Sequence, residues 1–298
     1  MFGGTGFLGR RIAEWLAGAG NDVRVGARHP ERATFHPGPG RIEAVRADVS
    51  DEASVARAVK DSAWVVNTVG HYVEKRGATF GTIHGQGALN VARQAKRAGA
   101  ERLIHVSGLG ADSASDSPYV RARGIGERLV GEAFESVTIL RPSAIFGPDD
   151  YFLNRIAGMA RRSPVLPLFG RGLTRLQPVF VENVAETCLK VLTDSATRCR
   201  VYELGGPRIY AYKDLVRLVA ERIGKRPAAV PVPFPVWDML AVAMTLLPES
   251  PLTRDQVKLM KRDNVVSERA WTLIDLDIRP VPLEEVLVDC IGSRPETS

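Results

Sequence analysis

Short apolar runs alternate with amphipathic stretches through the first half of this 298-residue chain. The apolar runs have the length and side-chain types of buried strands, and they predict strands over 22–27, 42–47, 64–69, 103–107 and 137–140. The stretches between them have helical spacing and predict helices over 10–19, 52–60, 80–98 and 120–134. Strands that alternate with helices favour a parallel sheet with right-handed crossovers. The predicted fold class is therefore α/β, with a doubly wound parallel sheet.

A glycine-rich turn runs directly into the first predicted helix. Its residues are Gly3, Thr5, Gly6, Phe7, Leu8 and Gly9. At a strand-to-helix junction, one glycine permits a tight bend and the next lets the main chain approach a pyrophosphate. The third lets the helix pack closely on its strand, with the helix N-terminus facing the phosphates. The alternative is an ordinary tight turn. The position at the first possible junction favours a dinucleotide site on a Rossmann sheet.

The strand that should lead into this turn is almost missing. Only Met1 and Phe2 precede Gly3, whereas a strand usually has about five residues. We expect either a start codon assigned too late or a shortened chain, and the intact pattern downstream favours the first.

The alternation of strands and helices is less regular after Arg141 and Pro142. A strand over 177–181, a helix over 184–193 and a strand over 201–204 are predicted, and both strands are expected to return to the sheet. From about Pro207 the chain is punctuated by prolines and is mostly helical. These shifts predict an NAD(P)-binding Rossmann domain over 1–206 and a smaller, mostly helical substrate or docking domain over 207–298. Residues 149–175 could instead belong to the substrate domain.

The end of the strand over 22–27 indicates which nucleotide would bind. No Asp or Glu stands there to accept a hydrogen bond from a ribose 2′-hydroxyl. Arg28 instead offers a planar, permanently charged guanidinium that suits a 2′-phosphate, and Arg10 or Arg11 could assist from the first helix. The alternative is that Arg28 is a solvated surface residue. We expect the cofactor to be NADP(H) rather than NAD(H).

Two further pairs of residues complete the expected cofactor site. Asp48 and Val49 follow the strand over 42–47 and are placed to meet the adenine. Val69 and Gly70 close the strand over 64–69, at the same edge of the predicted sheet.

Composition and charge narrow the class of protein. The chain is 45% hydrophobic and 25% charged, as in ordinary globular proteins. Its net charge of +6 is spread along the chain, which fits an anionic cofactor or membrane surface better than nucleic acid. The three cysteines show no metal-ligand spacing, and their odd number favours free thiols in a reducing cytoplasm.

Several of these motifs together resemble a known superfamily, the extended and atypical short-chain dehydrogenase/reductases, which include NAD-dependent epimerases and dehydratases. The match rests on the glycine turn, Asp48, Arg141-Pro142 and the Phe-Gly-Pro of 146–148. Farther along, Pro-Leu-Thr-Arg-Asp-Gln at 251–256 and Lys-Arg-Asp-Asn-Val-Val at 261–266 resemble bacterial relatives of the NADPH-binding accessory subunit of respiratory complex I. The resemblance covers nearly the whole chain. It implies a tightly held NADPH with a structural part in the mitochondrial member, and another relative is associated with ubiquinone biosynthesis.

The resemblance also implies a catalytic Ser, a Tyr and a Lys four residues after the Tyr. Tyr119 lies on the expected helix, twelve residues after Ser107, and Arg123 takes the Lys position. The guanidinium of Arg123 keeps the positive charge that lowers the pKa of a catalytic Tyr. A guanidinium is bulkier than an ammonium group and its N–H donors are fixed in one plane, so it is not expected to hold the nicotinamide ribose as a Lys does. His84 stands where extended members often carry Asn and could shuttle protons. The alternatives are a packed Tyr119, a Ser107 that merely ends a strand, and a structural His84.

An apolar stretch over 233–248 carries Trp237, Met239, Met244, Leu246 and Leu247, with Asp238 as its single charge. Between its prolines it predicts a helix of about twelve residues, too short for the ~20 that span a bilayer. It is either a buried helix of the small domain or a surface that contacts membrane lipid, a quinone tail or a partner subunit. The basic residues that follow, from Arg254 to Arg262, could meet anionic headgroups or form a solvated face.

Three functions stay open at this point. The first is an NADP(H)-binding atypical dehydrogenase/reductase linked to the respiratory quinone system, with weak or absent turnover. It would lie in the cytoplasm, with peripheral contact to the inner face of the membrane or to a respiratory complex. The second is an active NADPH-dependent reductase of a hydrophobic carbonyl or quinone-like substrate. The third is a nucleotide-sensing module that controls a protein partner.

Overall fold

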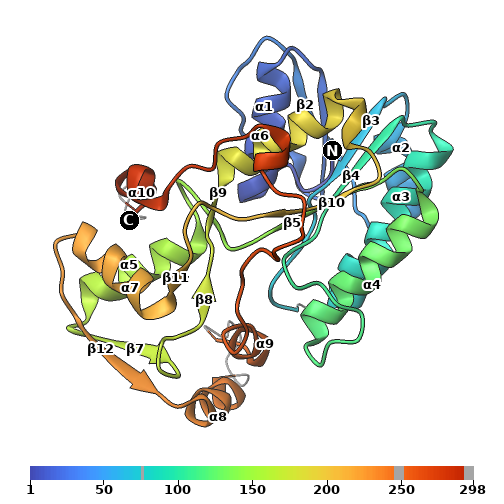
Figure 1. The fold of residues 1–298 in the computed structure, drawn as a ribbon. Coiled ribbons are helices and arrows are strands. Elements are labelled where there is room, and N and C mark those ends of the chain that lie inside the picture. Colours follow the sequence, from blue (N-terminus) through green and yellow to red (C-terminus); the bar gives the residue numbers. More distant parts are fainter. Residues whose placement is uncertain (75–76, 245–251, 292–298) are drawn as a thin grey trace. The chain divides into compact units, whose positions relative to one another are not determined.

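The computed structural model describes residues 1–74, 77–244 and 252–291, and the chain in it divides into two compact units (Figure 1). Unit 1 comprises Met1–Pro142, Val181–Leu204 and Ser267–Arg279. Unit 2 comprises Ser143–Phe180, Gly205–Val266 and Pro280–Ser298. Each unit is thus assembled from three stretches of sequence, whereas the pattern of elements predicted one boundary near residue 206.

The sheet of unit 1 is parallel and carries the predicted Rossmann topology. Four strands pair in the order β10-β5-β4-β3, and β1 pairs with β2. Their bounds are β1 (Val23–Ala27), β2 (Ile42–Arg46), β3 (Trp64–Asn67), β4 (Arg102–Val106), β5 (Thr138–Pro142) and β10 (Val201–Leu204). The prediction of an α/β fold with a parallel doubly wound sheet is confirmed.

Phe2 joins the two halves of this sheet. It forms parallel bridges to Gly26 of β1 and to Asn67 of β3. The Phe2 amide donates to Val66 O at 2.8 Å, and the Thr68 amide donates to Phe2 O at 3.0 Å. The Phe2 side chain is buried, and its ring lies against Gly26. The Met1 carbonyl accepts from the Gly26 amide at 2.8 Å, so Met1 and Phe2 together occupy the central position between β1 and β3.

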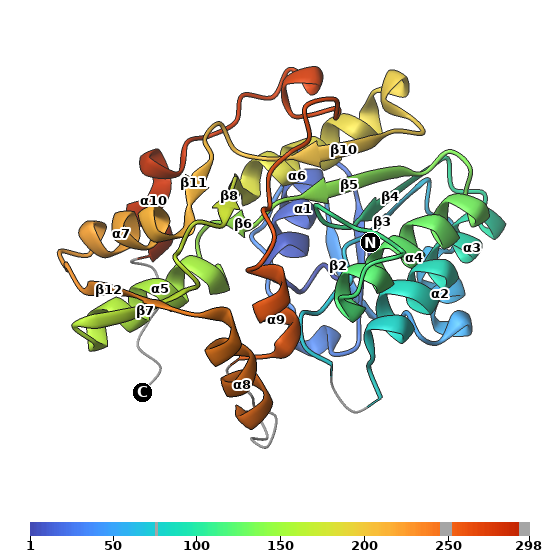
Figure 2. The same cartoon turned by 60° about the horizontal axis from the view of Figure 1, so that its bottom comes forward.

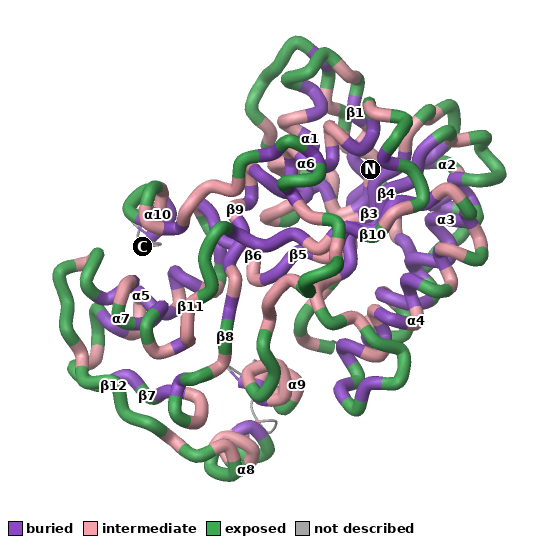
Figure 3. The backbone as a smooth tube through the Cα atoms, viewed as in Figure 1, coloured by how far each residue is buried: buried purple, intermediate pink, exposed green. Residues whose placement is uncertain are grey.

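Helices cover both faces of the sheet (Figures 1 and 2). α1 (Phe7–Gly18) and α6 (Val181–Thr193) pack together on one face. On the other face α2 (Glu52–Val59), α3 (Ala88–Arg97) and α4 (Pro118–Ala133) pack side by side. β1, β3, β4 and β5 are buried along most of their length (Figure 3), whereas β2 has only half-buried and exposed residues. Short 3₁₀ turns η1 (Pro30–Arg32), η3 (Ser195–Thr197) and η4 (Ile274–Leu276) connect elements of this unit.

The helix predicted over 80–98 is not uniform. Its first part is the π-helix η2 (Gly81–Gly87), and regular α-helical geometry begins only at Ala88. A Cβ at Gly87 would lie 2.8 Å from Val49 Cγ2, and the carbonyl of His84 packs against Gly126 of α4. Three glycines over 81–87 leave the backbone free to widen, and π-helical segments are frequent at functional sites. The wide turn places His84 against α4.

Unit 2 is built from helices around a five-residue parallel ladder and two shorter pairings. β7 (Val165–Phe169) pairs in parallel with β12 (Ala228–Val232), β6 (Ile145–Phe146) pairs with β9 (Val179–Phe180), and β8 (Arg175–Leu176) pairs with β11 (Tyr210–Ala211). Its helices are α5 (Tyr151–Arg162), α7 (Tyr212–Arg222), α8 (Phe234–Met244), α9 (Arg254–Leu259) and α10 (Leu283–Ile291). Leu153, Leu215 and Leu287 from α5, α7 and α10 are fully buried in its core.

The apolar helix predicted after Pro233 forms as α8, and its exposed residues favour the alternative of a contact surface over that of a buried helix. Ala241 is the one residue of α8 that is buried, whereas Val236, Met239 and Val242 are exposed. Apolar residues occur all around this helix, so no single face can remove them from water. Leu246 and Leu247 lie outside the described residues. Within the described part of the chain, no helix combines the length and apolarity needed to cross a bilayer.

Two glycines of α4 give a matched test of its packing. A Cβ at Gly126 would overlap the carbonyl oxygen of His84, whereas a Cβ at Gly131 meets nothing within 4 Å. Gly126→Ala should lower the free energy of unfolding by about 1–3 kcal/mol, because a rigid backbone must shift. Gly131→Ala should raise it by about 0.5–1 kcal/mol through helix propensity. Urea unfolding of both variants tests this, and an unchanged Gly126→Ala midpoint would contradict the packing described.

Candidate functional site

The glycine turn lies between the start of α1 and the segment after β3. Gly3 has φ +79°, in the left-handed region, and a Cβ there would lie 2.5 Å from Thr68 Oγ1. Gly9, the third glycine, packs so closely on Gly3 that a Cβ would overlap the Gly3 carbonyl oxygen. Both positions exclude other residues on steric grounds.

Gly6 is different, because packing does not require it. A Cβ there would meet only Gly3 O, at 3.4 Å, and Gly6 and Thr5 are exposed. Gly6 caps α1 without a side-chain hydrogen bond, and the first turn, with Phe7 and Leu8, carries no acidic residue. No side chain therefore caps the backbone N–H groups of the first turn of α1, and the space at this end of the helix is open. Such a helix N-terminus can accommodate a phosphate group.

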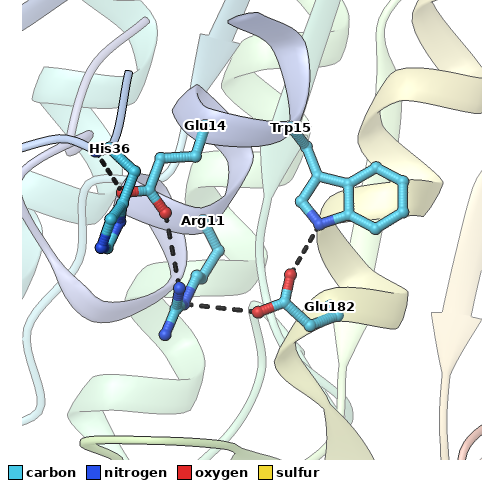
Figure 4. Close-up of polar contacts among 5 residues, drawn as sticks. All are labelled: Arg11, Glu14, Trp15, His36 and Glu182. Carbon is cyan, nitrogen blue, oxygen red and sulfur yellow. Dashed lines mark hydrogen bonds and ion pairs between the residues drawn. The ribbon is translucent and has the colours of Figure 1, made fainter. Parts of the chain in front are cut away.

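Arg28 lies at the end of β1 and is exposed. Arg11, in contrast, turns away toward α6 (Figure 4). Its Nε lies 3.3 Å from Glu182 Oε1 and its Nη1 lies 3.5 Å from Glu14 Oε2. Glu182 also accepts a 2.6 Å hydrogen bond from Trp15 Nε1. The carboxylates of Glu14 and Glu182 therefore hold the Arg11 side chain.

The other predicted cofactor residues line the same edge of the sheet. Asp48 Oδ1 accepts hydrogen bonds from the amide and the hydroxyl of Ser50, at 2.9 and 2.7 Å. Val49 is buried, and its carbonyl accepts from Asn90 Nδ2 at 2.9 Å. The Val69 amide donates to Asn67 Oδ1 at 3.1 Å, and the neighbouring Gly70 is exposed. These segments follow β2 and β3, where open α/β sheets bind ligands.

Tyr119 and Arg123 lie one turn apart on α4 and contact each other directly. Arg123 Nε donates to the Tyr119 hydroxyl at 2.7 Å, and the guanidinium carbon lies 5.0 Å from the ring centroid. Cβ atoms built on Gly70 and Gly108 would lie 3.3 and 3.6 Å from the two terminal nitrogens of Arg123. The guanidinium therefore reaches the loops that follow both β3 and β4. It occupies the carboxyl edge of the sheet.

The hydroxyl of Tyr119 is strongly disfavoured as an anion. Burial raises its pKa above the usual range, and the nearby Arg123 charge only partly opposes this. Tyr72 shares a side-chain hydrogen bond with Tyr119 and raises the pKa further, and the two rings lie 5.3 Å apart. Tyr72 is not among the site residues predicted from the sequence. Its place just after the strand over 64–69 was the signal that could have found it.

Ser107 follows β4 and is almost fully buried. Among the described residues its hydroxyl oxygen has no hydrogen-bond partner. On the strands beside it, His105 Nδ1 lies 3.3 Å from Asn67 Nδ2, and burial lowers the pKa of His105 to about 3. A buried hydroxyl without a partner costs about 1–3 kcal/mol, which a ligand with a polar atom at this position would relieve.

His84 is held inside the unit as a neutral ring. Its Nε2 lies 3.1 Å from the carbonyl oxygen of His71, and its ring meets the Tyr119 ring edge-on. Burial first, and the Arg123 charge second, lower the pKa of His84 to about 3. A proton shuttle near neutral pH requires a charged form that this environment suppresses. The contacts favour the structural alternative for His84.

The position of α4 is fixed by a charged pair and by close backbone contacts. Arg141 of β5 donates two hydrogen bonds to Glu127, at 2.9 and 2.6 Å, and its third nitrogen lies 3.6 Å from Glu203. Gly124 packs directly on the backbone of Ser113. Tyr119 and Arg123 therefore belong to a rigid helix. No cluster of three or more metal-ligating side chains is found among the residues that the structure describes.

Comparison with known proteins agrees with this geometry. A sequence model of a family described as NAD(P)H-binding matches residues 3–164, from the glycine turn to just past the end of α5. The chain belongs to this NAD(P)H-binding family. It is 32% identical, over 95% of its length and 74% of the relative's, to NADH dehydrogenase [ubiquinone] 1 alpha subcomplex subunit 9, mitochondrial, of Arabidopsis thaliana. The expected kinship with the complex I accessory subunit is confirmed.

Two further comparisons extend the family. The chain is 31% identical, over 78% of its length and 73% of the relative's, to a ceramide reductase of Caulobacter vibrioides. The solved structure of a UDP-glucose 4-epimerase from Thermus thermophilus, in complex with NAD, superposes with a TM-score of 0.72 at 20% identity, covering 98% of this chain and 96% of the other. The second likeness supports the fold alone.

The neutral histidines predict a dependence of stability on pH. The folded-state pKa of His84, about 3, lies below the ordinary value of 6.5, so the unfolded chain binds a proton that the folded chain does not. Stability is therefore lost as the pH falls below 6.5, by about 2 kcal/mol at pH 5 for this residue. His84→Gln should remove that part of the loss between pH 7 and 5 in urea unfolding. His29→Gln, at an exposed histidine, is the control, and equal pH dependence in both variants would contradict the burial of His84 as a neutral ring.

Proposed function

We propose that this protein is an NADP(H)-binding, atypical short-chain dehydrogenase/reductase linked to the respiratory quinone system, with weak or absent turnover. The observation that carries the proposal is the contact between Arg123 Nε and the Tyr119 hydroxyl, together with the raised pKa of that hydroxyl. A tyrosine works as a general acid or base when its pKa is brought toward neutrality. Here burial moves it the other way.

The nucleotide would lie along the carboxyl edge of the sheet in unit 1. Gly3, Gly6 and Gly9 would shape the pyrophosphate loop, and the open N-terminus of α1 would face the phosphates. Thr5, Phe7 and Leu8 complete that loop. Asp48 and Val49 would border the adenine, and Val69 and Gly70 the middle of the cofactor. When bound, the nicotinamide would supply a hydride, and Arg123 would hold positive charge beside the nicotinamide ribose.

Arg28 supports NADP(H) over NAD(H). Its guanidinium is exposed at the strand end, where no carboxylate is available for a ribose 2′-hydroxyl. A planar cation at this place recognises a 2′-phosphate, which only the phosphorylated cofactor carries.

The role of Arg28 can be tested by calorimetry with both nucleotides. Wild type should bind NADPH more tightly than NADH. Arg28→Ala should weaken NADPH by about 10- to 100-fold, as expected for about 1.5–3 kcal/mol from hydrogen bonds to a charged group, and leave NADH unchanged. Arg57→Ala, at an exposed arginine of α2, is the matched control. Equal affinity of wild type for the two nucleotides would overturn the assignment of NADP(H).

The respiratory setting is supported by the relatives. The Arabidopsis relative is named as a subunit of a ubiquinone-dependent NADH dehydrogenase. The exposed apolar residues Val236, Met239 and Val242 of α8 suit contact with a membrane surface or with a partner subunit there. We accordingly place the protein in the cytoplasm with peripheral contact to the inner face of the membrane.

An active reductase of a hydrophobic carbonyl substrate is the second candidate. The Caulobacter relative is named as a ceramide reductase, so a lipid-like carbonyl is within the chemistry of near relatives. In such a reaction the hydride would pass from the nicotinamide to the carbonyl carbon, and Tyr119 would give a proton to the oxygen. The unpartnered hydroxyl of Ser107 would donate a hydrogen bond to that oxygen.

Arg123→Lys distinguishes the two candidates. With weak or absent turnover, NADPH oxidation in the presence of a long-chain ketone or a short-chain quinone should stay at the background rate in both wild type and variant. The reason is that Tyr119 stays buried whichever cation stands beside it. A rise of about tenfold or more in Arg123→Lys, about 1.4 kcal/mol of barrier, would favour the reductase. NADPH binding measured on the same variant confirms that its nucleotide site is intact.

A further inference from the structure

Unit 2 contains a cavity of about 440 Å³ between the turn after β7 and the start of α8. Apolar side chains form most of its lining, among them Phe169, Leu173, Pro231, Pro233 and Phe234. Small-molecule pockets usually enclose about 300–1,000 Å³ and are mainly apolar. The volume and apolar lining of this open pocket fall within the range of ligand sites, and neither candidate function uses it.

The walls of the cavity are fixed by aromatic packing. Trp237 stacks on Phe169 with ring centroids 4.4 Å apart, and its indole nitrogen donates to Leu168 O at 3.0 Å. Gly170 has φ +57°, and a Cβ there would lie 2.6 Å from the ring of Phe234. Because the Phe234 ring fills the place of a side chain at residue 170, the two walls hold each other in position.

One basic residue, Arg171, lines this cavity, and a second lies on the segment next to the turn that carries it. Arg171 is among its lining residues, and Lys213 lies beside the same turn, since its amide donates to Gly172 O at 2.9 Å. Among the described residues neither side chain has an acidic partner. Lys261, in contrast, lies 5.5 Å from the Phe234 ring centroid but is paired with Asp238 at 2.8 Å. The uncompensated positive charge is thus at the turn that carries Arg171.

We propose that this cavity binds the hydrocarbon chain of a long-chain fatty acid, with the carboxylate held by Arg171 and Lys213. The apolar walls remove the chain from water, and the two cations meet the single negative charge. An uncharged isoprenoid or sterol would leave both cations without a function. The proposal concerns unit 2 alone and does not depend on the nucleotide bound by unit 1.

Trp237 makes binding directly observable, because its ring stacks on Phe169 of the cavity wall. A stearate dibrominated in mid-chain quenches an indole by contact. Titrated into the full-length protein below its micelle concentration, it should quench fluorescence saturably, with one molecule per chain. Trp237→Phe should remove this quenching, and the signal of the remaining tryptophans should stay unchanged. Equal quenching in Trp237→Phe, or no saturation in wild type, would overturn the proposal.

Charge and apolar lining are tested separately with matched variants. The paired change Arg171→Glu and Lys213→Glu should weaken binding by about tenfold or more, and so should the uncharged methyl ester of the probe. Leu173→Glu places a charge in the wall at an exposed residue and should abolish saturable quenching, whereas Val288→Glu, exposed on α10, should leave it unchanged. All variants should retain wild-type NADPH binding by calorimetry.

Equal affinity for the acid and its ester would overturn the carboxylate site. Quenching only by vesicles of brominated phosphatidylglycerol would overturn the cavity site and assign this surface to a bilayer.

Discussion

The backbone of Phe2 is the constraint on which the geometry of unit 1 depends. It is hydrogen-bonded to β3, and its bridges to Gly26 and Asn67 place it between β1 and β3. The glycine turn follows it immediately, so the position of Gly3 against Thr68 is set by this pairing. Because the two parts of the sheet meet at Met1 and Phe2, directly before the glycine turn, the direction in which α1 leaves the sheet is defined there.

A second constraint acts through α4. Gly124 and Gly126 let this helix approach the backbone of Ser113 and of η2, and Glu127 binds Arg141 of β5. A helix anchored on both sides cannot easily adjust the position of Arg123. The guanidinium is planar and always charged, so the site has a fixed positive charge where a lysine would supply a flexible one.

The sequence predicted most of unit 1 and little of unit 2. Alternating apolar runs are strong signals for buried parallel strands, and the bounds of β1 and β2 agree with prediction within one residue. The π-helical turn at His84 could not be foreseen, because its apolar spacing is that of an ordinary helix and the widening depends on contact with α4. Unit 2 consists of short ladders such as β7 with β12, whose pairing joins residues far apart in the chain and leaves no local period.

The residues of the candidate site also differ in how well the sequence predicts them. The glycine turn and Arg28 have local signals, whereas the contact of Tyr72 with Tyr119 depends on tertiary packing. This contact bears on function more than any motif does. It adds to the rise in the pKa of the Tyr119 hydroxyl, and a phenol that resists ionisation is poorly suited to proton transfer near neutral pH.

Nucleotide binding and catalytic turnover therefore require different properties of the site residues. The site is better suited to binding than to turnover. The hydroxyl of Ser107 is buried without a partner among the described residues, a cost that a bound ligand would remove. Gly6 leaves open space that packing does not require. Both features favour an occupied site. Tyr119, in contrast, is held neutral by its surroundings, so occupancy by a nucleotide need not lead to proton transfer. The family includes one protein named as a respiratory subunit and one named as a reductase. In the function proposed above, binding uses the loop before α1 and turnover would use the pair in α4, so the two properties can diverge.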